Sequence, residues 1–153
     1  MSKKRVRPIA LGIFRRGDRI FVTRSYDPVK DQVFYRPLGG TIEFGEHGAE
    51  TVVRELKEEI GADVTGLRYL DTFENIFTYM DKPGHEIVLL YEGTFADPSW
   101  YERDIERGLE QTNDPPLMQG VWMRLEDLGA GTPLYPDGLL EVIRAQTRRD
   151  EVM

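Results

Sequence analysis

The sequence contains no cysteine among its 153 residues. Disulfide bonds and thiolate-ligated metal centres are therefore excluded. A reducing compartment suits such a chain, and we expect a cytoplasmic protein.

Long apolar runs are also missing, although hydrophobic residues make up 40% of the chain. No stretch approaches the roughly 20 consecutive apolar residues that a membrane-spanning helix needs. The N-terminal segment MSKKRVRPIALGIF is basic and then apolar, but its apolar part is short, holds a proline and lacks a small-residue cleavage site. We interpret it as a first strand instead of a signal peptide, and we expect no membrane partner.

Internal repeats, low-complexity tracts and long linkers are absent as well, so we treat residues 1–153 as a single domain. The formal net charge of −7 argues against a nucleic acid polymer as a partner of the whole surface. A small anionic molecule is compatible with this charge if local cations bind it. The oligomeric state is open, and a homodimer is one option.

Hydrophobic patterning predicts more strands than helices, and the helices come singly. The expected strands lie within residues 8–25 around a Gly17-Asp18 turn, within 33–44 around a Gly39-Gly40 turn, within 63–95 around a Pro83-Gly84 turn, and at 120–125. Residues 99–111 favour a short helix, and residues 137–149 favour a closing helix. This order of elements predicts an α/β sandwich around a mixed sheet.

Between His47 and Ile60 the hydrophobic period changes to that of an α-helix. The residues that fall within one apolar stripe, and so predict the core-facing side, are Ala49, Val52, Val53, Leu56 and Ile60. Glu55, Glu58 and Glu59 cluster about a third of a turn away from this stripe. The core-facing side and the acidic side of the helix are therefore different faces.

The acidic face has an unfavourable arrangement of charges. Like charges three and four positions apart repel, and Glu58 and Glu59 also stand near the negative end of the helix dipole, just before Gly61. Ion pairs of Arg54 with Glu50 and Glu58 contribute only about 0.3–0.5 kcal/mol each. A hard divalent cation offsets the repulsion better, because Mg²⁺ is held by carboxylates together with substrate phosphates. We expect Mg²⁺ or Mn²⁺ here, and a solvated acidic face is the alternative interpretation.

The segment from Gly40 to Ala62 resembles the signature box of the Nudix hydrolases. The seven fixed identities of that box are all present and in register, at Gly40, Glu46, Arg54, Glu55, Glu58, Glu59 and Gly61. Independent residues would give this match about once in 20⁷ starting positions. Ala62 is the one departure, because the family usually has a bulkier aliphatic residue there, and we expect it to affect packing instead of chemistry. The resemblance implies a Nudix-like α/β/α sandwich.

The resemblance also implies an activity, namely hydrolysis of a nucleoside diphosphate linked to another group X. The products would be a nucleoside monophosphate and phospho-X. In the family pattern Glu55, Glu58 and Glu59 are metal ligands, joined by the carbonyl of Gly40. The same pattern gives Arg54 and Glu46 the role of supporting the loop and the helix, and we include both with the catalytic residues.

The chemistry of phosphoanhydride cleavage agrees with this implication. Water must attack a phosphorus atom that is shielded by negative oxygens, so a cation has to neutralise them and a carboxylate has to accept a proton. We expect Glu58 or Glu59 to be the general base. Glu110, which we also include among the candidate metal ligands, is the second candidate, and Glu74 is the third.

Residues outside the box suggest how a substrate is bound. Arg24 resembles an arginine that several family members place on a phosphate, and Arg36 can grip phosphate through its two-pronged guanidinium. Tyr79 is a candidate platform for a nucleobase, at a position where family members that act on dinucleoside polyphosphates often have tyrosine. We interpret His85-Glu86 as the start of a strand and not as an acid/base pair.

These residues favour a metal-dependent nucleotide pyrophosphohydrolase that acts on a dinucleoside polyphosphate or a nucleoside triphosphate. A Nudix-fold module that senses a nucleotide without cleaving it is an alternative, although such modules typically lose box glutamates and none is lost here. A pyrophosphatase for ADP-sugars is a further alternative, and the proline that such enzymes tend to carry near position 79 is absent.

Overall fold

The computed structural model describes residues 4–107 and 119–152. The elements are β1 (Val6–Ile13), β2 (Arg15–Arg16), β3 (Arg19–Asp27), β4 (Gln32–Arg36), β5 (Leu38–Thr41), α1 (Gly48–Ile60), β6 (Val64–Tyr79), β7 (Lys82–Phe95), the 3-10 helix η1 (Pro98–Glu102), β8 (Ile105–Arg107), β9 (Gln119–Arg124), the 3-10 helix η2 (Leu125–Asp127) and α2 (Leu139–Val152). No helix in the described ranges is long and apolar enough to cross a membrane.

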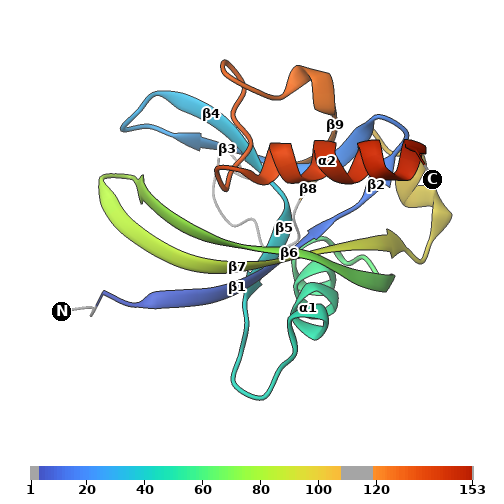
Figure 1. The fold of residues 1–153 in the computed structure, drawn as a ribbon, viewed down its shortest axis with the longest axis horizontal. Coiled ribbons are helices and arrows are strands. Elements are labelled where there is room, and N and C mark those ends of the chain that lie inside the picture. The colour runs from blue at the N-terminus through green and yellow to red at the C-terminus, as the bar shows by residue number, and fades with distance from the viewer. Residues whose placement is uncertain (1–3, 108–118, 153) are drawn as a thin grey trace.

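The strands form two sheets (Figure 1). Sheet A has the order β5-β1-β7-β6, in which β1 and β7 run parallel and the other neighbours run antiparallel. Sheet B has the order β2-β3-β9-β8, and β4 also pairs with β3. The predicted α/β architecture with a mixed sheet is confirmed.

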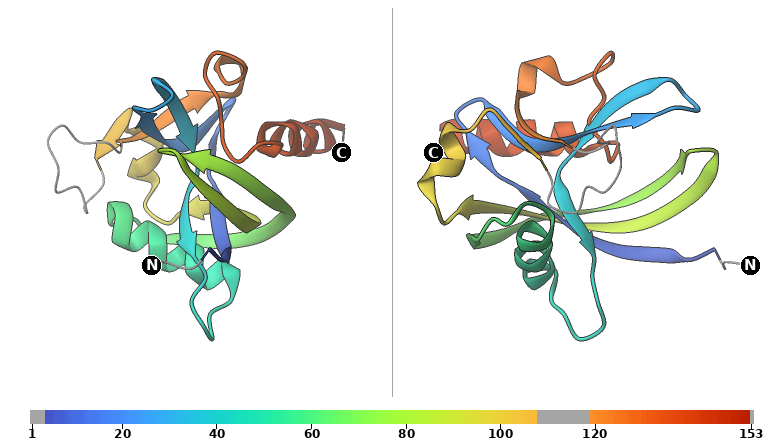
Figure 2. Two further views of the ribbon diagram at one scale, coloured as in Figure 1. Left: turned by 90° about the vertical axis from the view of Figure 1, so that its left-hand side faces the viewer. Right: turned by 180° about the vertical axis from the view of Figure 1, so that it is seen from behind.

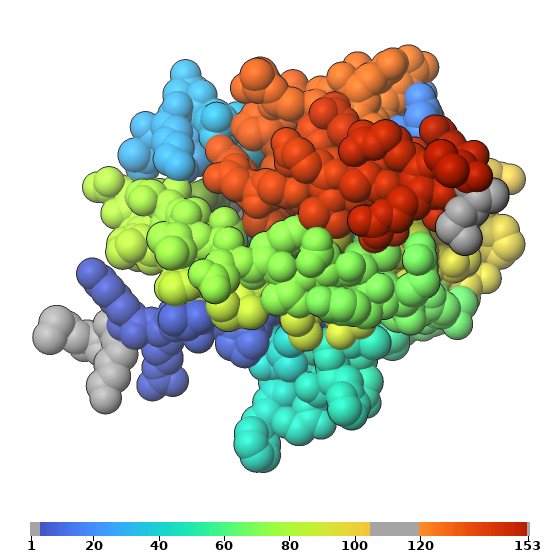
Figure 3. All heavy atoms as spheres, in the orientation of Figure 1, coloured from blue at the N-terminus to red at the C-terminus, as the bar shows by residue number. Residues whose placement is uncertain are grey.

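Two apolar cores hold the helices against the strands. One core combines Ile9, Leu11, Val88 and Leu90 of sheet A with Leu139 and Ile143 of α2. The other combines Ala10 of β1 and Val52 and Leu56 of α1 with an aromatic group that includes Phe21, Phe95 and Trp122. Because alternate residues of β1 enter different cores, α1 and α2 lie on opposite faces of sheet A. Figure 3 shows the atoms of α2 (red) lying beside those of β6 (light green) on the face toward the viewer.

Helix α1 forms where the sequence predicts it, but its buried face is rotated slightly. It follows His47 and ends at Gly61, whose φ of 73° closes the helix in the left-handed conformation. Val52 and Leu56 are buried as predicted, whereas Val53 is 42% exposed and Thr51 is buried in its place. The hydroxyl of Thr51 is satisfied by a hydrogen bond, so its burial costs little.

Two of the expected turns lie elsewhere. Gly39 and Gly40 belong to β5 itself, and a Cβ at Gly39 would lie 1.9 Å from the carbonyl oxygen of Ala10 on β1. Close approach of two strands, and not a turn, therefore requires glycine there.

The long β6–β7 hairpin turns at Met80-Asp81, where φ is 51° and 64°. Pro83 and Gly84 pair with Thr78 and Phe77 inside the ladder. The short helix expected near residue 99 is the 3-10 helix η1, which is followed by the strand β8.

Candidate active site

Arg54 is the centre of a hydrogen-bonded cluster on one side of α1. Its Nε and Nη2 donate to the two carboxylate oxygens of Glu46 at 2.8 and 3.0 Å. Its Nη1 donates to Glu55 at 2.9 Å and to Glu58 at 3.3 Å, and its Nη2 also donates to the carbonyl of Thr41 at 3.0 Å. Arg54 therefore connects the loop before α1, strand β5 and two of the three predicted metal ligands.

Glu46 is held in its ionised form by this cluster. In addition to Arg54, it accepts the hydroxyl of Thr51 at 2.6 Å and the backbone N–H of Glu43 at 3.2 Å. The hydrogen bonds from Arg54 and Thr51 lower the pKa of Glu46 from 4.5 to about 2. The hydrogen bond to Glu46 is also the main cause of a raised pKa of Arg54, and the hydrogen bond to Glu55 raises that pKa further. The ion pair of Glu46 and Arg54, which we call the clamp, joins the loop before α1 to the helix, in the supporting role that the box pattern implies.

Gly40 lies directly beside the carboxylate of Glu55. A Cβ at position 40 would stand 2.5 Å from the Glu55 carboxyl carbon and from its Oε1. Alternation along β5 places Gly40 on the side of α1 and Thr41 on the opposite side of sheet A, since these residues pair with Ala10 and Ile9. Glycine is therefore needed here so that Glu55 can approach the strand.

Among the described residues, no group of three or more His, Cys, Asp or Glu side chains is already arranged to hold a metal ion. The bonds of Arg54 to Glu55 and Glu58 account for part of this, because both carboxylates point to the guanidinium. The donor chemistry nevertheless fits a hard divalent cation, since carboxylates and a carbonyl are the ligands such cations prefer. Glu58 is 47% exposed and is therefore free to turn from Arg54 to a cation, whereas Glu55 is already placed beside Gly40.

A pocket of about 400 Å³ lies between the β3–β4 and β6–β7 hairpins, whose tips project on the same side of the molecule (Figures 1 and 2). Its walls include the aromatic rings of Phe34, Phe77, Tyr79 and Tyr135. The charged side chains that line it include Asp27, Lys30, Arg36 and Glu86. The size and the mixture of aromatic and polar groups are typical of a site for a small organic ligand.

Arg36 and Tyr79, two of the predicted substrate-binding residues, meet in this pocket. The ring of Tyr79 makes an edge contact with Phe34 at a centroid distance of 5.7 Å. The ring of Tyr135 lies 5.5 Å from Phe34 on the same measure. The three rings form an aromatic wall that can hold a flat group.

Arg24 and Glu74 do not line the pocket. Ser25 and Asp27 lie on the face of β3 that lines the pocket. Arg24 is exposed and lies on the opposite face of β3, so it points away from the pocket. Glu74 is exposed on β6 and does not line the pocket. Glu110 lies outside the described residues.

Thr41 connects the Arg54 cluster to the pocket. Its carbonyl accepts Arg54, and its hydroxyl accepts Nη2 of Arg7 at 2.8 Å. Nη1 of Arg7 lies 3.9 Å from the carboxylate of Glu86, which lines the pocket. A chain of polar contacts through Thr41 and Arg7 therefore links the Arg54 cluster to the pocket.

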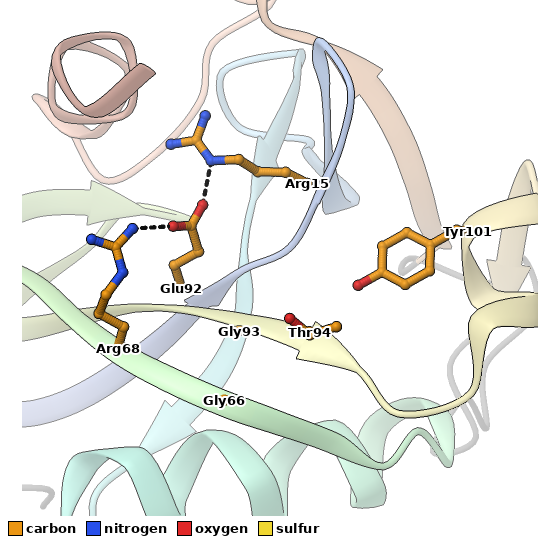
Figure 4. A pocket seen from close by; sticks show the side chains of 7 residues that line it. All are labelled: Arg15, Gly66, Arg68, Glu92, Gly93, Thr94 and Tyr101. Carbon is orange, nitrogen blue, oxygen red and sulfur yellow. Dashed lines mark hydrogen bonds and ion pairs between the residues drawn. The ribbon is translucent and has the colours of Figure 1, made fainter. Parts of the chain in front are cut away.

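A second hollow, of about 310 Å³, lies elsewhere on sheet A and contains none of the predicted residues (Figure 4). The carboxylate of Glu92 there accepts Arg15 on one oxygen and Arg68 on the other. Arg15 also donates to Thr147 of α2 at 2.6 Å. Arg15 therefore fastens α2 to Glu92 of β7, and Arg68 is paired with the same carboxylate, which indicates a structural role for this hollow.

Arg7 and Glu86 are residues that the sequence analysis missed as parts of the candidate site. Arg7 shares its face of β1 with the buried Ile9, although its own side chain is 55% exposed, and Glu86 shares its face of β7 with the buried Val88. The signal in the sequence was a charged residue at a position two residues from a buried apolar residue of the same strand. Glu86 is only 4% exposed and lies within β7, so treating it as a strand end was wrong.

Comparison with known proteins places this geometry in a family. A family model described as NUDIX domain matches residues 3–145. The NAD-capped RNA hydrolase NudC of Pseudomonas aeruginosa is 27% identical over 144 residues, which cover 86% of this chain and 49% of that protein. An 8-oxo-dGTP diphosphatase of Proteus vulgaris is 34% identical over 79 residues, which cover 50% of this chain and 69% of that protein.

Solved structures show the same fold. A MutT NUDIX hydrolase from Burkholderia pseudomallei superimposes with a TM-score of 0.64 at 19% sequence identity, over 92% of this chain and 98% of that one. The chain spans about half the length of the first curated relatives, the NudC proteins. The family match nevertheless covers most of the present sequence and includes the whole Arg54 cluster. The chain therefore belongs to the NUDIX domain family.

Proposed function

We propose that this protein is a divalent-metal-dependent pyrophosphohydrolase that cleaves a nucleoside diphosphate linked to X into a nucleoside monophosphate and phospho-X. Membership of the NUDIX family and the hydrolase names of its relatives support the reaction class. The complete set of box glutamates supports catalysis over mere sensing.

The observation that carries this proposal is the position of Thr41 between two sites. On one side, Gly40 and the Arg54 cluster present carboxylates suited to a cation and phosphates. On the other side, Arg7 reaches from the Thr41 hydroxyl toward Glu86 in the aromatic pocket. A nucleotide needs both environments within its own length, because its base is flat and apolar while its phosphates are anionic.

Each residue then has a defined task. When bound, the metal ion would neutralise phosphate oxygens and lower the pKa of a bound water. Glu55, Glu58, Glu59 and the Gly40 carbonyl would hold it, with Glu58 or Glu59 accepting the proton of the attacking water. Arg54 would keep Glu55 oriented through the bond that it already makes.

The pocket would bind the nucleoside end of the substrate. Tyr79 and Phe34 would hold the base against an aromatic wall, and Arg36 would provide a cation near the phosphates or the ribose. Arg7 would lie along the path of the phosphate chain, since it spans the distance from Thr41 to Glu86. Arg24 points elsewhere, so we assign phosphate contact to Arg7 and Arg36 before Arg24.

We favour nucleoside triphosphates and dinucleoside polyphosphates as substrates. The relatives include a hydrolase of NAD-capped RNA, but the net charge of −7 favours a small nucleotide over a polymer for this chain. A nucleotide-sensing module and an ADP-sugar pyrophosphatase are the competing functions. We also propose a cytoplasmic protein, with a homodimer as one option.

A substrate panel tests the proposal. Nucleoside triphosphates, a dinucleoside tetraphosphate, ADP-ribose and a capped RNA are each incubated with Mg²⁺ or Mn²⁺ and with excess chelator, and the products are separated by ion-exchange chromatography. We expect a nucleoside monophosphate among the products, no turnover with chelator, and a melting temperature that rises with added metal. Equal turnover with and without chelator would contradict the mechanism, and nucleotide binding without products would favour the sensing module.

A further inference from the structure

Glu86 is a buried carboxylate whose partners are unusually distant. Its residue is 4% exposed, yet it lines the pocket between the two hairpins. Nδ2 of Asn75 approaches its Oε1 at 3.4 Å, and Nη1 of Arg7 approaches its Oε2 at 3.9 Å. Charge-assisted hydrogen bonds are normally about 2.7–2.9 Å long, so both oxygens retain capacity to accept stronger ones.

The surroundings limit what could supply those hydrogen bonds. The aromatic wall of Phe34, Tyr79 and Tyr135 favours a flat ring, and a volume of about 400 Å³ accommodates one. Lys30 also lines the pocket, but its Nζ already donates to the carbonyl of Thr78 at 2.8 Å. A planar ligand that carries its own N–H donors is therefore the best complement to Glu86.

Among nucleobases, guanine has the matching edge. Its N1–H and its 2-amino group are neighbouring donors, so they can meet the two oxygens of one carboxylate. Adenine presents an unprotonated ring nitrogen at the same position, and its lone pair would face the negative carboxylate. A site built around a buried charged acceptor rejects a ligand that leaves it unpaired more strongly than apolar packing alone could.

We propose that Glu86 makes the pocket selective for guanine nucleotides over adenine nucleotides. This inference rests on the proposed function only in taking the pocket as the nucleotide site. It does not require that the bound nucleotide be cleaved. Binding and turnover therefore test the two proposals separately.

The binding experiment compares GMP, IMP and AMP on the wild-type protein by isothermal titration calorimetry. IMP keeps the N1–H but lacks the 2-amino group, so it removes one of the two hydrogen bonds. We expect IMP to bind about tenfold more weakly than GMP, and AMP about a hundredfold more weakly. Equal affinity for GMP and AMP, or no binding of any of the three, would overturn the inference even if another nucleotide were hydrolysed.

Variants identify the residue responsible. Glu86→Gln keeps the shape but removes the charge, and we expect its affinities for GMP and AMP to come within about threefold of each other. Asp81→Asn is the matched control, because Asp81 is exposed at the tip of the same hairpin outside the pocket, and its backbone conformation suits asparagine.

The selectivity of Glu86→Gln shows whether Glu86 is the group that selects the base. Retained selectivity in a folded Glu86→Gln protein would show that another group selects the base. If this variant does not fold, the wild-type series of three nucleotides decides by itself. Selective binding of GMP without any turnover of GTP would leave the inference standing and would count against the proposed hydrolysis alone.

Discussion

Gly40→Ala is the substitution whose effect follows most directly from the position of Glu55 beside β5. The added methyl group would lie 2.5 Å from the carboxyl carbon of Glu55, whereas ordinary contacts begin at 3.4 Å. The carboxylate must therefore retreat by about 0.9 Å. The backbone of Gly40 does not have a positive φ, so alanine is tolerated there in all other respects.

The expected loss concerns catalysis more than folding. Displacement of a catalytic group by about 1 Å costs roughly a hundredfold in rate, so we expect kcat to fall by that factor. The clash involves the end of a flexible side chain, so the free energy of unfolding should fall by less than about 1 kcal/mol. Turnover of the preferred nucleotide with saturating Mg²⁺ and the urea midpoint measure the two effects separately.

Two other glycines serve as controls for Gly40→Ala. A Cβ at Gly131 would meet nothing within 4 Å, and Gly131→Ala should change neither turnover nor stability. A Cβ at Gly39 would meet the backbone of Ala10 at 1.9 Å, so Gly39→Ala should destabilise the fold itself. Wild-type turnover in Gly40→Ala would refute the importance of the Glu55 position. A fall in turnover explained by the unfolded fraction would refute it equally.

Two further predictions concern the pocket and the clamp. Tyr79→Ala should raise KM for the preferred nucleotide with little change in kcat, because about 1–3 kcal/mol of stacking on the base is lost. An unchanged KM together with a lower melting temperature would show that Tyr79 only packs against its neighbours. The pKa of Glu46 is lowered to about 2, so its contribution to stability is complete above about pH 4.5 and is lost as the pH falls toward 2. The difference in urea midpoint between wild type and Glu46→Gln should therefore be constant near neutral pH and disappear at about pH 2. A difference that persists at pH 2 would contradict a stabilising ion pair between Glu46 and Arg54.

The helix and the box were predictable because both have strong local signals. The change of hydrophobic period and Gly61 define α1 to within one residue of the predicted start, and the spacing of the box defines its register. The face of α1 was less predictable, since Thr51 is buried only because Glu46 accepts its hydroxyl. Such a partner is invisible to a hydrophobicity pattern.

The pocket could not be predicted, because it depends on which strands become neighbours. Phe34 and Tyr79 are 45 positions apart in the sequence and meet only after two hairpins project side by side. Pro83-Gly84 looked like a turn, but the hairpin turns at Met80-Asp81 and so determines which side chains face the pocket. Arg24 was assigned by resemblance, and the alternation along β3 directs it away.

The most direct test of catalysis by the acidic side of α1 is the turnover number of three isosteric variants measured with Mg²⁺. Glu58→Gln and Glu59→Gln should each lower kcat by about a hundredfold or more, while Glu50→Gln should be nearly silent. The side chain of Glu50 accepts the backbone N–H of His47 at 2.9 Å, which the carbonyl oxygen of glutamine can also do. Equal losses in all three variants would indicate general damage to the helix, and wild-type turnover in both Glu58→Gln and Glu59→Gln would contradict the proposed site.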